Sequence, residues 1–288
     1  MPELPEVETT VLDLNKKVLG RTFIDVWSDF KKQVKKPENF EQFKKEIKGR
    51  KIKKVRRKGK NILFDLSGNK TLLIHQKLTG HLLFGKWVLK EGKWLPPSGP
   101  LSDKINAYIH LLFTFDNSQM LALSDLRKFA KVELWDRKNL KKELSSLGPE
   151  PLEKDFAFEK FKEILTKKKG KIKQVLMDQT VIAGIGNIYS DEILWKAKIH
   201  PFKKVSKLNE EELKRIFLAM KRILERAIEL KGTSTSDFRR VSGQKGYYEK
   251  ERKVYRREDK KCSRCGVKIK RVKIAGRSAH FCPKCQNL

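Results

Sequence analysis

The sequence contains no run of eighteen apolar residues, and its first ten residues, MPELPEVETT, are acidic and include no apolar segment. The first absence excludes a membrane-spanning helix, and the second excludes a secretory signal peptide. We therefore expect a soluble, cytoplasmic protein that has no membrane partner. With 288 residues and a hydrophobic content of 39%, the chain is long enough for two domains and apolar enough to fold.

Acidic residues are also scarce. The chain has 35 Asp and Glu residues against 67 Lys and Arg residues, which gives a formal net charge of +32 at pH 7. The excess is densest at residues 44–60, 167–173 and 239–261. This pattern favours a polyanionic partner such as a nucleic acid, bound less tightly as the salt concentration rises. On charge alone, a role in solubility or in the ribosome stays open.

Cysteine is absent from the first 261 residues. The four cysteines that follow form two C-x-x-C pairs, which are separated by a segment, 266–281, that alternates like a hairpin. In a cytosolic protein this spacing predicts one structural zinc ion held by four thiolates, with no open position for catalysis. Two disulfides or a redox pair are the alternatives. The predicted ligands are Cys262, Cys265, Cys282 and Cys285.

The hydrophobic pattern divides the chain into a β-rich part and a helical part. Helical spacing from Pro5 to Gly20 is followed by short β-type runs up to Asp136, interrupted by a helix-like segment at 38–47. Asn209 and Glu212 resemble a capping box at the start of a helix that Gly232 ends. We expect an α+β, multidomain protein with a β-sandwich or barrel first. The expected segments are an N-terminal domain at 1–136, a connector at 137–152, a helical domain at 153–232, a polar basic loop and linker at 233–259 with few core candidates, and a zinc hairpin at 260–288.

The N-terminal sequence offers a nucleophile. If Met1 is removed, Pro2 exposes a secondary amine, and an α-amino group is far more often neutral at pH 7 than a lysine. A neutral amine can attack the C1′ carbon of a deoxyribose, displace the base and leave an iminium ion. Glu3 stands beside it and can move protons. On its own, Pro2 would be interpreted as an ordinary residue before a helix.

Four motifs in one order resemble the formamidopyrimidine-DNA glycosylase family over essentially the whole chain. They are PELPEVET after Met1, RKGKN at 57–61, AGIGNIYSDEILW at 183–195, and the terminal zinc hairpin with its arginine. The resemblance implies an N-terminal β-sandwich and a helix-two-turns-helix domain that clamp double-stranded DNA containing oxidised bases or abasic sites. It also implies a flipped-out nucleotide, a monomer, and a bacterial-type enzyme associated with the nucleoid.

The activity that the resemblance implies is a bifunctional glycosylase and abasic-site lyase of base excision repair. It would remove 8-oxoguanine and formamidopyrimidines through a Schiff base on the N-terminal proline, followed by β,δ-elimination. Two alternatives stay open. One is an endonuclease VIII-like glycosylase for oxidised pyrimidines, and the other is a zinc-containing nucleic-acid-binding protein without catalytic activity.

The resemblance also implies roles for individual residues. Pro2 corresponds to the Schiff-base nucleophile and Glu3 to the general acid/base. Lys60 corresponds to a lysine that contacts phosphate and assists β-elimination, and Arg277 to an arginine that binds phosphate and is implicated in δ-elimination. The family fills the hole left by the flipped base with three side chains, and the corresponding residues here are Leu78, Arg127 and Phe129. The family's further phosphate-binding or DNA-contacting residues correspond to Lys168, Asn187 and His110.

The sequence departs from the family pattern at three positions. The first of the fillers is Leu78 where the family usually has methionine, which keeps the apolar character with less adaptability. Tyr108 replaces the first histidine of a His-x-His pair, and Arg256 replaces a glycine after Val-Tyr. The segment 233–255 resembles the loop that closes over the flipped base. Without the resemblance, Phe129 would be interpreted as an ordinary core residue of a β-strand, and only the resemblance makes it a filler.

Overall fold

The computed structural model describes residues 1–234 and 237–288, which form two compact units. The first unit comprises Met1–Ser145 and Leu230–Glu249, and the second comprises Ser146–Glu229 and Lys250–Leu288. Among the described residues, no helix is long and apolar enough to cross a membrane. Residues 235 and 236, which belong to the segment expected to cover the lesion, lie outside the described residues.

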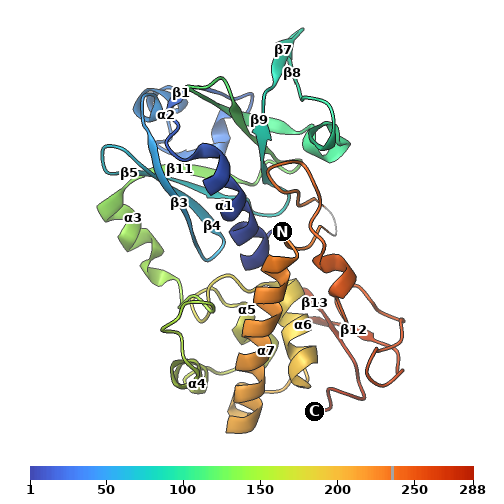
Figure 1. Ribbon diagram of the computed structural model, residues 1–288. Coiled ribbons are helices and arrows are strands. Elements are labelled where there is room, and N and C mark those ends of the chain that lie inside the picture. Colours follow the sequence, from blue (N-terminus) through green and yellow to red (C-terminus); the bar gives the residue numbers. More distant parts are fainter. Residues whose placement is uncertain (235–236) are drawn as a thin grey trace. The chain divides into compact units, whose positions relative to one another are not determined.

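Two antiparallel-rich sheets face each other in the first unit (Figure 1). One has the strand order β1-β9-β10-β6 and the other the order β2-β11-β5-β4-β3, with β2 parallel to β11. A small hairpin, β7-β8, projects from the first sheet. The strands are β1 (Phe23–Trp27), β2 (Val34–Lys36), β3 (Ile52–Lys58), β4 (Asn61–Leu66), β5 (Lys70–His75), β6 (His81–Gly85), β7 (Val88–Lys90), β8 (Lys93–Leu95), β9 (Ile109–Phe115), β10 (Met120–Ser124) and β11 (Lys131–Asp136).

The main core of the first unit lies between these sheets. The strands β4 and β9 are buried along nearly their whole length, and alternate residues of each belong to this core, Ile62, Phe64 and Leu66 in β4 and Leu111, Phe113 and Phe115 in β9. Phe23, Phe113 and Phe115 pack with ring centroids 5.1–5.3 Å apart. Two separate sheets with this core make a sandwich, so the prediction of a β-sandwich is confirmed and the barrel alternative is wrong.

The α-helices among the described residues of the first unit are α1 (Leu4–Val18), α2 (Phe40–Ile47) and α3 (Arg137–Glu143). The first, α1, begins as its sequence predicts, with Pro5 in its first turn, and ends before Gly20, whose φ of 76° suits glycine. It packs on β3 and β4 through the buried face that Val7, Val11 and Leu14 provide. This packing places the first residues of the chain next to the turn between β3 and β4.

The second unit is a helical domain that carries a small hairpin. Its helices are α4 (Phe158–Thr166), α5 (Ile172–Met177), α6 (Asn187–Ala197) and α7 (Glu210–Glu229), and its strands are β12 (Lys270–Ile274) and β13 (Arg277–Phe281). The predicted capping box of α7 is present, because Asn209 Oδ1 accepts from the Glu212 N–H at 2.9 Å and Glu212 Oε2 accepts from the Asn209 N–H at 3.2 Å. The predicted hairpin between the two cysteine pairs is also confirmed.

The segment after α7 differs from its prediction as a loop with few core candidates. Phe238, Val241, Tyr248 and Val254 are all buried. The N–H groups of Tyr247 and Tyr248 donate to the carbonyls of Leu230 and Gly232, and the Phe84 N–H donates to the Val241 carbonyl at 2.7 Å. The polar composition hid these positions because only a few apolar residues are spread along the segment.

Candidate functional site

Pro2 and Glu3 are buried at the start of α1 in the first unit. The Glu3 N–H donates to Glu6 Oε2 at 2.9 Å, and Glu6 Oε1 accepts from the Thr233 N–H at 2.7 Å. One carboxylate therefore ties the beginning of α1 to the segment that returns after α7. Gly232 allows this close approach, because a Cβ there would lie 2.9 Å from Glu6 Oε1.

Burial is the largest influence on the amine at the N-terminus, and it lowers the pKa of the Met1 amine below its ordinary value of 8.0. The positive charge of Lys60 lowers this pKa further, while the carboxylates of Glu3, Glu6 and Asp237 raise it. The environment therefore increases the neutral fraction of an amine held at this end of the chain. A neutral amine is the form that can act as a nucleophile.

Lys60 lies in the turn between β3 and β4, where Gly59 has a φ of 58°. The side chain of Lys60 is buried, and its charge is close enough to the N-terminus to affect the amine. The ion pair between Arg57 and Glu8, with 2.7 Å between Nε and Oε2, fixes this hairpin against α1. Lys60, which is distant from Pro2 and Glu3 in the sequence, is thus brought close to them in one unit.

The first unit also brings together the three predicted fillers. Leu78 lies in the loop between β5 and β6, and Arg127 and Phe129 lie in the loop between β10 and β11. The Arg127 guanidinium lies over the Phe129 ring, 4.7 Å from its centroid. Phe129 is 51% exposed, so the alternative that it is a core residue is excluded. Leu78 is half-buried.

His110 and Tyr108 stand next to each other but in different environments. His110, in β9, is buried, and its Nδ1 donates to Asp29 Oδ1 at 2.9 Å. Tyr108 is 40% exposed and precedes β9. Asp29 therefore fixes the orientation of the imidazole, whereas the tyrosine side chain faces solvent.

In the second unit, Asn187 begins α6 at the edge of a polar pocket. Such a helix start presents N–H groups that suit an anion. The Oδ1 atom of Asn187 is buried and has no hydrogen-bond partner among the described residues. Lys168 and Arg277 do not line this pocket. Its lining is formed by Asn187, Tyr255, Arg256, Glu258, Arg271, Ser278 and His280.

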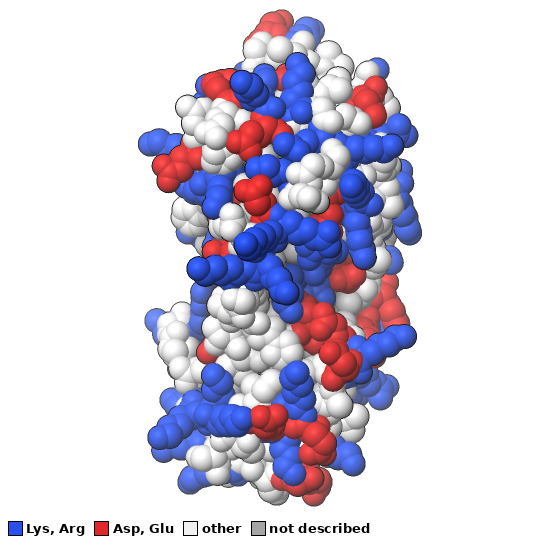
Figure 2. All heavy atoms as spheres, turned by 90° about the vertical axis from the view of Figure 1, so that its left-hand side faces the viewer, with Lys and Arg blue, Asp and Glu red and all other residues white. Residues whose placement is uncertain are grey.

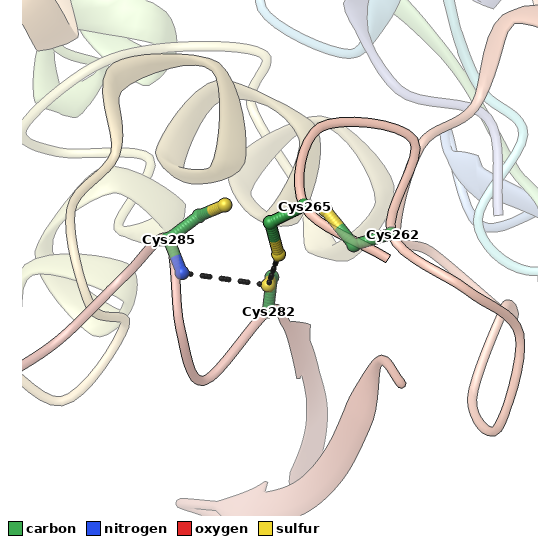
Figure 3. A group of neighbouring side chains, drawn as sticks. All are labelled: Cys262, Cys265, Cys282 and Cys285. Carbon is green, nitrogen blue, oxygen red and sulfur yellow. Dashed lines mark hydrogen bonds between the residues drawn. The ribbon is translucent and has the colours of Figure 1, made fainter. Parts of the chain in front are cut away.

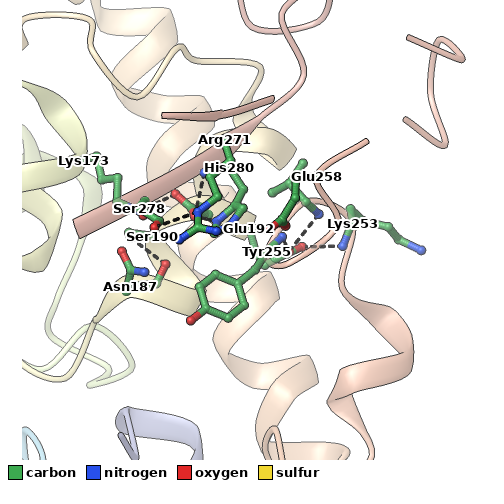
Figure 4. A network of polar contacts seen from close by, with 12 residues as sticks. Lys173, Asn187, Ser190, Glu192, Lys253, Tyr255, Glu258, Arg271, Ser278 and His280 are labelled. Carbon is green, nitrogen blue, oxygen red and sulfur yellow. Dashed lines mark hydrogen bonds and ion pairs between the residues drawn. The ribbon is translucent and has the colours of Figure 1, made fainter. Parts of the chain in front are cut away.

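A buried network of polar side chains lies beneath this pocket (Figure 4). Asp191 accepts from Lys173 Nζ at 2.5 Å and from His280 Nδ1 at 2.9 Å, and all three side chains are almost fully buried. Glu192 accepts from the N–H groups of residues 253, 254 and 255 at 2.8–3.0 Å. Burial raises the pKa of Glu192. The two carboxylates of α6 therefore hold the zinc hairpin and the segment before it.

Arg277 is at the tip of the β12-β13 hairpin. Ile274 pairs with Arg277 across a two-residue turn, and both turn residues, Ala275 and Gly276, have positive φ values of 46° and 72°. Such a turn matches the twist of a hairpin. The Arg277 side chain is exposed, and Lys168 is half-buried in the turn after α4.

The four cysteines converge at the base of this hairpin (Figure 3). Their Sγ atoms all lie within 4.8 Å of one another. Zinc–sulfur bonds of about 2.3 Å in a tetrahedron place the sulfurs about 3.8 Å apart, so the four thiolates fit one zinc ion. Trp195 of α6 packs on this cluster, and its Nε1 donates to Cys262 Sγ at 3.5 Å. The prediction of one structural zinc is confirmed, and its role is to fold the hairpin.

Basic side chains are numerous on the surface. On the face drawn in Figure 2, Lys and Arg side chains are spread over both units, and Asp and Glu side chains are fewer. Several of the acids are already paired, as Glu8 is with Arg57 and Asp65 with Arg56. The uncompensated positive charge suits a polyanion.

Sequence analysis missed several residues that shape these sites. Glu6 could have been found from the sequence, because its spacing from Glu3 is that of a capping box. The link from Glu6 to Thr233 spans 227 residues and the link from Asp191 to His280 spans 89, and no local pattern marks either.

Comparisons with known proteins cover nearly the whole chain. A sequence model described as the formamidopyrimidine-DNA glycosylase N-terminal domain matches residues 1–132, and one described as the H2TH domain of the same protein matches 147–239. A third, described as the zinc finger found in FPG and IleRS, matches 259–288. The formamidopyrimidine-DNA glycosylase of Pelotomaculum thermopropionicum is 38% identical over 290 residues, with 100% of each chain covered.

Solved structures of DNA complexes are similar over the same length. A mutant Lactococcus lactis Fpg bound to Fapy-dG-containing DNA superposes with a TM-score of 0.88 at 35% identity, covering 100% of both chains. The Lactococcus lactis Fpg bound to DNA with an abasic site has a TM-score of 0.87 at 35% identity, covering 99% of this chain and 100% of that chain.

Proposed function

This chain belongs to the formamidopyrimidine-DNA glycosylase family, and from that premise we propose that it excises oxidised purines from double-stranded DNA and then cleaves the backbone through the amine of Pro2. The observation that carries the proposal is that Pro2 and Glu3 are buried at the start of α1 near Lys60, at an end of the chain where burial lowers the pKa of the Met1 amine. Relatives of similar fold are bound to Fapy-dG and to abasic DNA, which are the substrates of the two steps.

The first step is base excision. The neutral amine of Pro2 attacks C1′ of the damaged nucleotide, the glycosidic bond breaks, and its electrons leave with the base, which takes up a proton. The Glu3 carboxyl group, buried next to this amine, is suited to move the proton that the amine loses. Displacement of the base leaves C1′ bonded to both the proline nitrogen and O4′. The nitrogen lone pair then expels O4′, which takes up a proton, so the sugar ring opens and the product is an iminium ion between the proline nitrogen and C1′.

The second step is strand cleavage. The iminium ion makes a C2′ proton acidic, and its removal expels the 3′ phosphate by β-elimination. A second elimination expels the 5′ phosphate. We assign Lys60 in the first unit and Arg277 in the second to the phosphates, because Lys60 places a cation near the start of α1 and Arg277 offers one from the exposed tip of the zinc hairpin. Lys168, His110 and Asn187 are assigned to further phosphates, which would hold the strand during both steps.

Base flipping leaves a hole in the duplex, and we assign Leu78, Arg127 and Phe129 to fill it. An exposed aromatic ring with a guanidinium over it offers a flat apolar face together with a cation, which suits contact with stacked bases. The zinc ion takes no part in the chemistry. Held by Cys262, Cys265, Cys282 and Cys285, it would keep the hairpin folded so that Arg277 is presented from a rigid tip.

Two further properties belong to this proposal. The protein acts as a monomer in the cytoplasm, at the nucleoid, where its substrate lies. Sedimentation of the protein with and without duplex DNA tests the first property, because a dimer would double the mass in both conditions.

Borohydride trapping tests the proposal directly. Borohydride reduces an iminium ion to a stable amine, so protein that begins at Pro2 should form a covalent adduct with DNA that contains 8-oxoguanine or an abasic site. Protein that retains Met1 should form none, because Pro2 is then an amide, and Pro2→Gly should form much less. Pro5→Ala is the matched control, since Pro5 lies in the same buried turn without carrying the amine. Undiminished trapping in Pro2→Gly would assign the nucleophile to another residue.

A further inference from the structure

A single buried carboxylate joins the two loops that carry the proposed hole-filling residues. Asp125, which directly follows β10, is 0% exposed. Its Oδ1 accepts from the Thr79 hydroxyl, and its Oδ2 accepts from the Ala130 N–H at 2.7 Å and from Gln33 Nε2 at 3.4 Å. Thr79 belongs to the loop of Leu78. The Asp125 carboxylate thus bonds to Ala130 within the loop between β10 and β11, and to Thr79 in the loop between β5 and β6.

The Thr79 hydroxyl bonds to the loop between β10 and β11 both as a donor and as an acceptor. It donates to Asp125 and accepts from the backbone N–H of Arg127 at 3.1 Å. Each hydroxyl can donate once and accept up to twice, so both of these bonds are available to one threonine. The backbone of a proposed filler is therefore bonded to the residue that follows Leu78.

The two loops also touch directly. A Cβ on Gly80 would lie 3.1 Å from the Cβ of Ala130 and 2.5 Å from the carbonyl oxygen of Gln76, so no larger side chain fits at Gly80 without a shift. Behind the loop, the His81 ring is buried, which lowers its pKa, and its Nε2 lies 2.9 Å from Asn106 Oδ1. The bonds of Thr79 to Asp125 and to the Arg127 N–H are directional, so they fix how one loop lies against the other.

We propose that Asp125 and Thr79 are positioning residues that hold Leu78 at a set distance from Arg127 and Phe129, so that the two loops enter the DNA helix as one wedge. This inference rests on the proposed function, because it needs those three side chains to enter the duplex. Neither Asp125 nor Thr79 touches the reacting sugar in this scheme. Their effect is on the opening of the duplex before the chemistry begins.

The test measures wedge insertion separately from chemistry. A 2-aminopurine placed next to the base opposite the lesion reports insertion by stopped-flow fluorescence, with no bond broken. Thr79→Val keeps the shape of the side chain and removes both hydroxyl bonds, and Thr79→Ser restores them. Thr71→Val is the matched control, because Thr71 is also buried and donates to an aspartate, Asp65, at 3.1 Å, but lies in β5 within the same sandwich.

We expect Thr79→Val to slow insertion by about tenfold, the size of effect that a lost hydrogen bond to a buried carboxylate produces. Excision from a paired 8-oxoguanine duplex should fall by the same factor through kcat, with KM little changed. Thr79→Ser should recover most of the wild-type rate. Thr71→Val should lower the unfolding temperature and leave the insertion rate as it is.

Three results would overturn the inference: insertion at the wild-type rate in Thr79→Val, no recovery in Thr79→Ser, or equal slowing in Thr71→Val. The last would show that general loss of stability, and not the connection between the loops, controls insertion. Failure of the proposed function looks different. Wild-type protein that forms no borohydride adduct with abasic DNA would contradict the proposed chemistry, whereas the fluorescence comparison still decides the role of Thr79 and Asp125.

Discussion

Removal of the Lys60 charge should shift the pH dependence of strand cleavage upward. The nucleophile must be neutral, so the rate rises with pH as the amine loses its proton and levels off above the pKa of the amine. Burial and the Lys60 charge both lower the pKa of the Met1 amine, and the carboxylates around it raise this pKa; we expect the Pro2 amine to experience the same influences once Met1 is removed. In Lys60→Gln the positive charge is gone, the protonated amine is less disfavoured, and its pKa rises.

The ordinary pKa of the amine sets an upper limit on how much the cleavage rate at pH 7 can change by this route. An amine with the ordinary value of 8.0 is about one-tenth neutral at pH 7, so lowering its pKa can raise the reactive fraction by at most about tenfold. Loss of the Lys60 charge through this route alone therefore costs less than about tenfold at pH 7, and nothing at a pH well above 8. A loss that persists at high pH belongs to the second role proposed for Lys60, its contact with a DNA phosphate.

Single-turnover cleavage of duplex DNA with a preformed abasic site, measured from pH 5.5 to 9.5, separates these contributions. Lys54→Gln is the control, because it removes one positive charge from an exposed position in β3 and leaves the N-terminus untouched. Lys54→Gln should keep the wild-type midpoint. A midpoint in Lys60→Gln that coincides with the wild-type one would refute the electrostatic argument, whatever happens to the plateau rate.

Two further predictions concern the wedge and the zinc. Phe129→Ala should lower excision of 8-oxoguanine by tenfold or more without changing the unfolding temperature, because the ring is 51% exposed. Leu126→Ala, in the same loop and 47% exposed, serves as the control and should cleave normally. Chelation of zinc, or Cys265→Ser, should unfold the hairpin and weaken DNA binding, since structural zinc sites contribute on the order of 10 kcal/mol to folding. Unchanged affinity in metal-free protein, measured by fluorescence anisotropy, would remove the hairpin from DNA binding.

The sequence predicted those elements whose physical cause is local. Periodicity located α1 and α7, the capping box at Asn209 gave the start of α7, and the C-x-x-C spacing gave the zinc ligands. Each of these depends on residues within a few turns of each other, or on a spacing that one metal ion imposes. The resemblance to a family supplied the rest of the candidate site, and the residue roles it implies stay predictions.

What the sequence could not predict depends on pairs of residues that meet only in the folded chain. The connection of Asp13 to Arg240 and that of Asp103 to Arg239 hold the segment after α7 against the sandwich, across 227 and 136 residues. In a chain so rich in Lys and Arg, nothing in the composition distinguishes these two arginines from exposed ones. Their burial explains why this segment belongs to the first unit although it follows the helical domain in sequence.

Exposed charges and buried charges have different roles in this protein. Most of the +32 charge is exposed and screened, and such charges attract DNA without fixing any geometry. Geometry is fixed instead by a few buried carboxylates, Glu6, Asp125 and Asp191, each of which bonds to groups from separate segments. Breaking one bond of a buried carboxylate leaves a charge without compensation, so these few positions should tolerate substitution far less than the many lysines do. Affinity for DNA is therefore spread over many residues, whereas the placement of the amine, the wedge and the zinc hairpin depends on single acidic side chains.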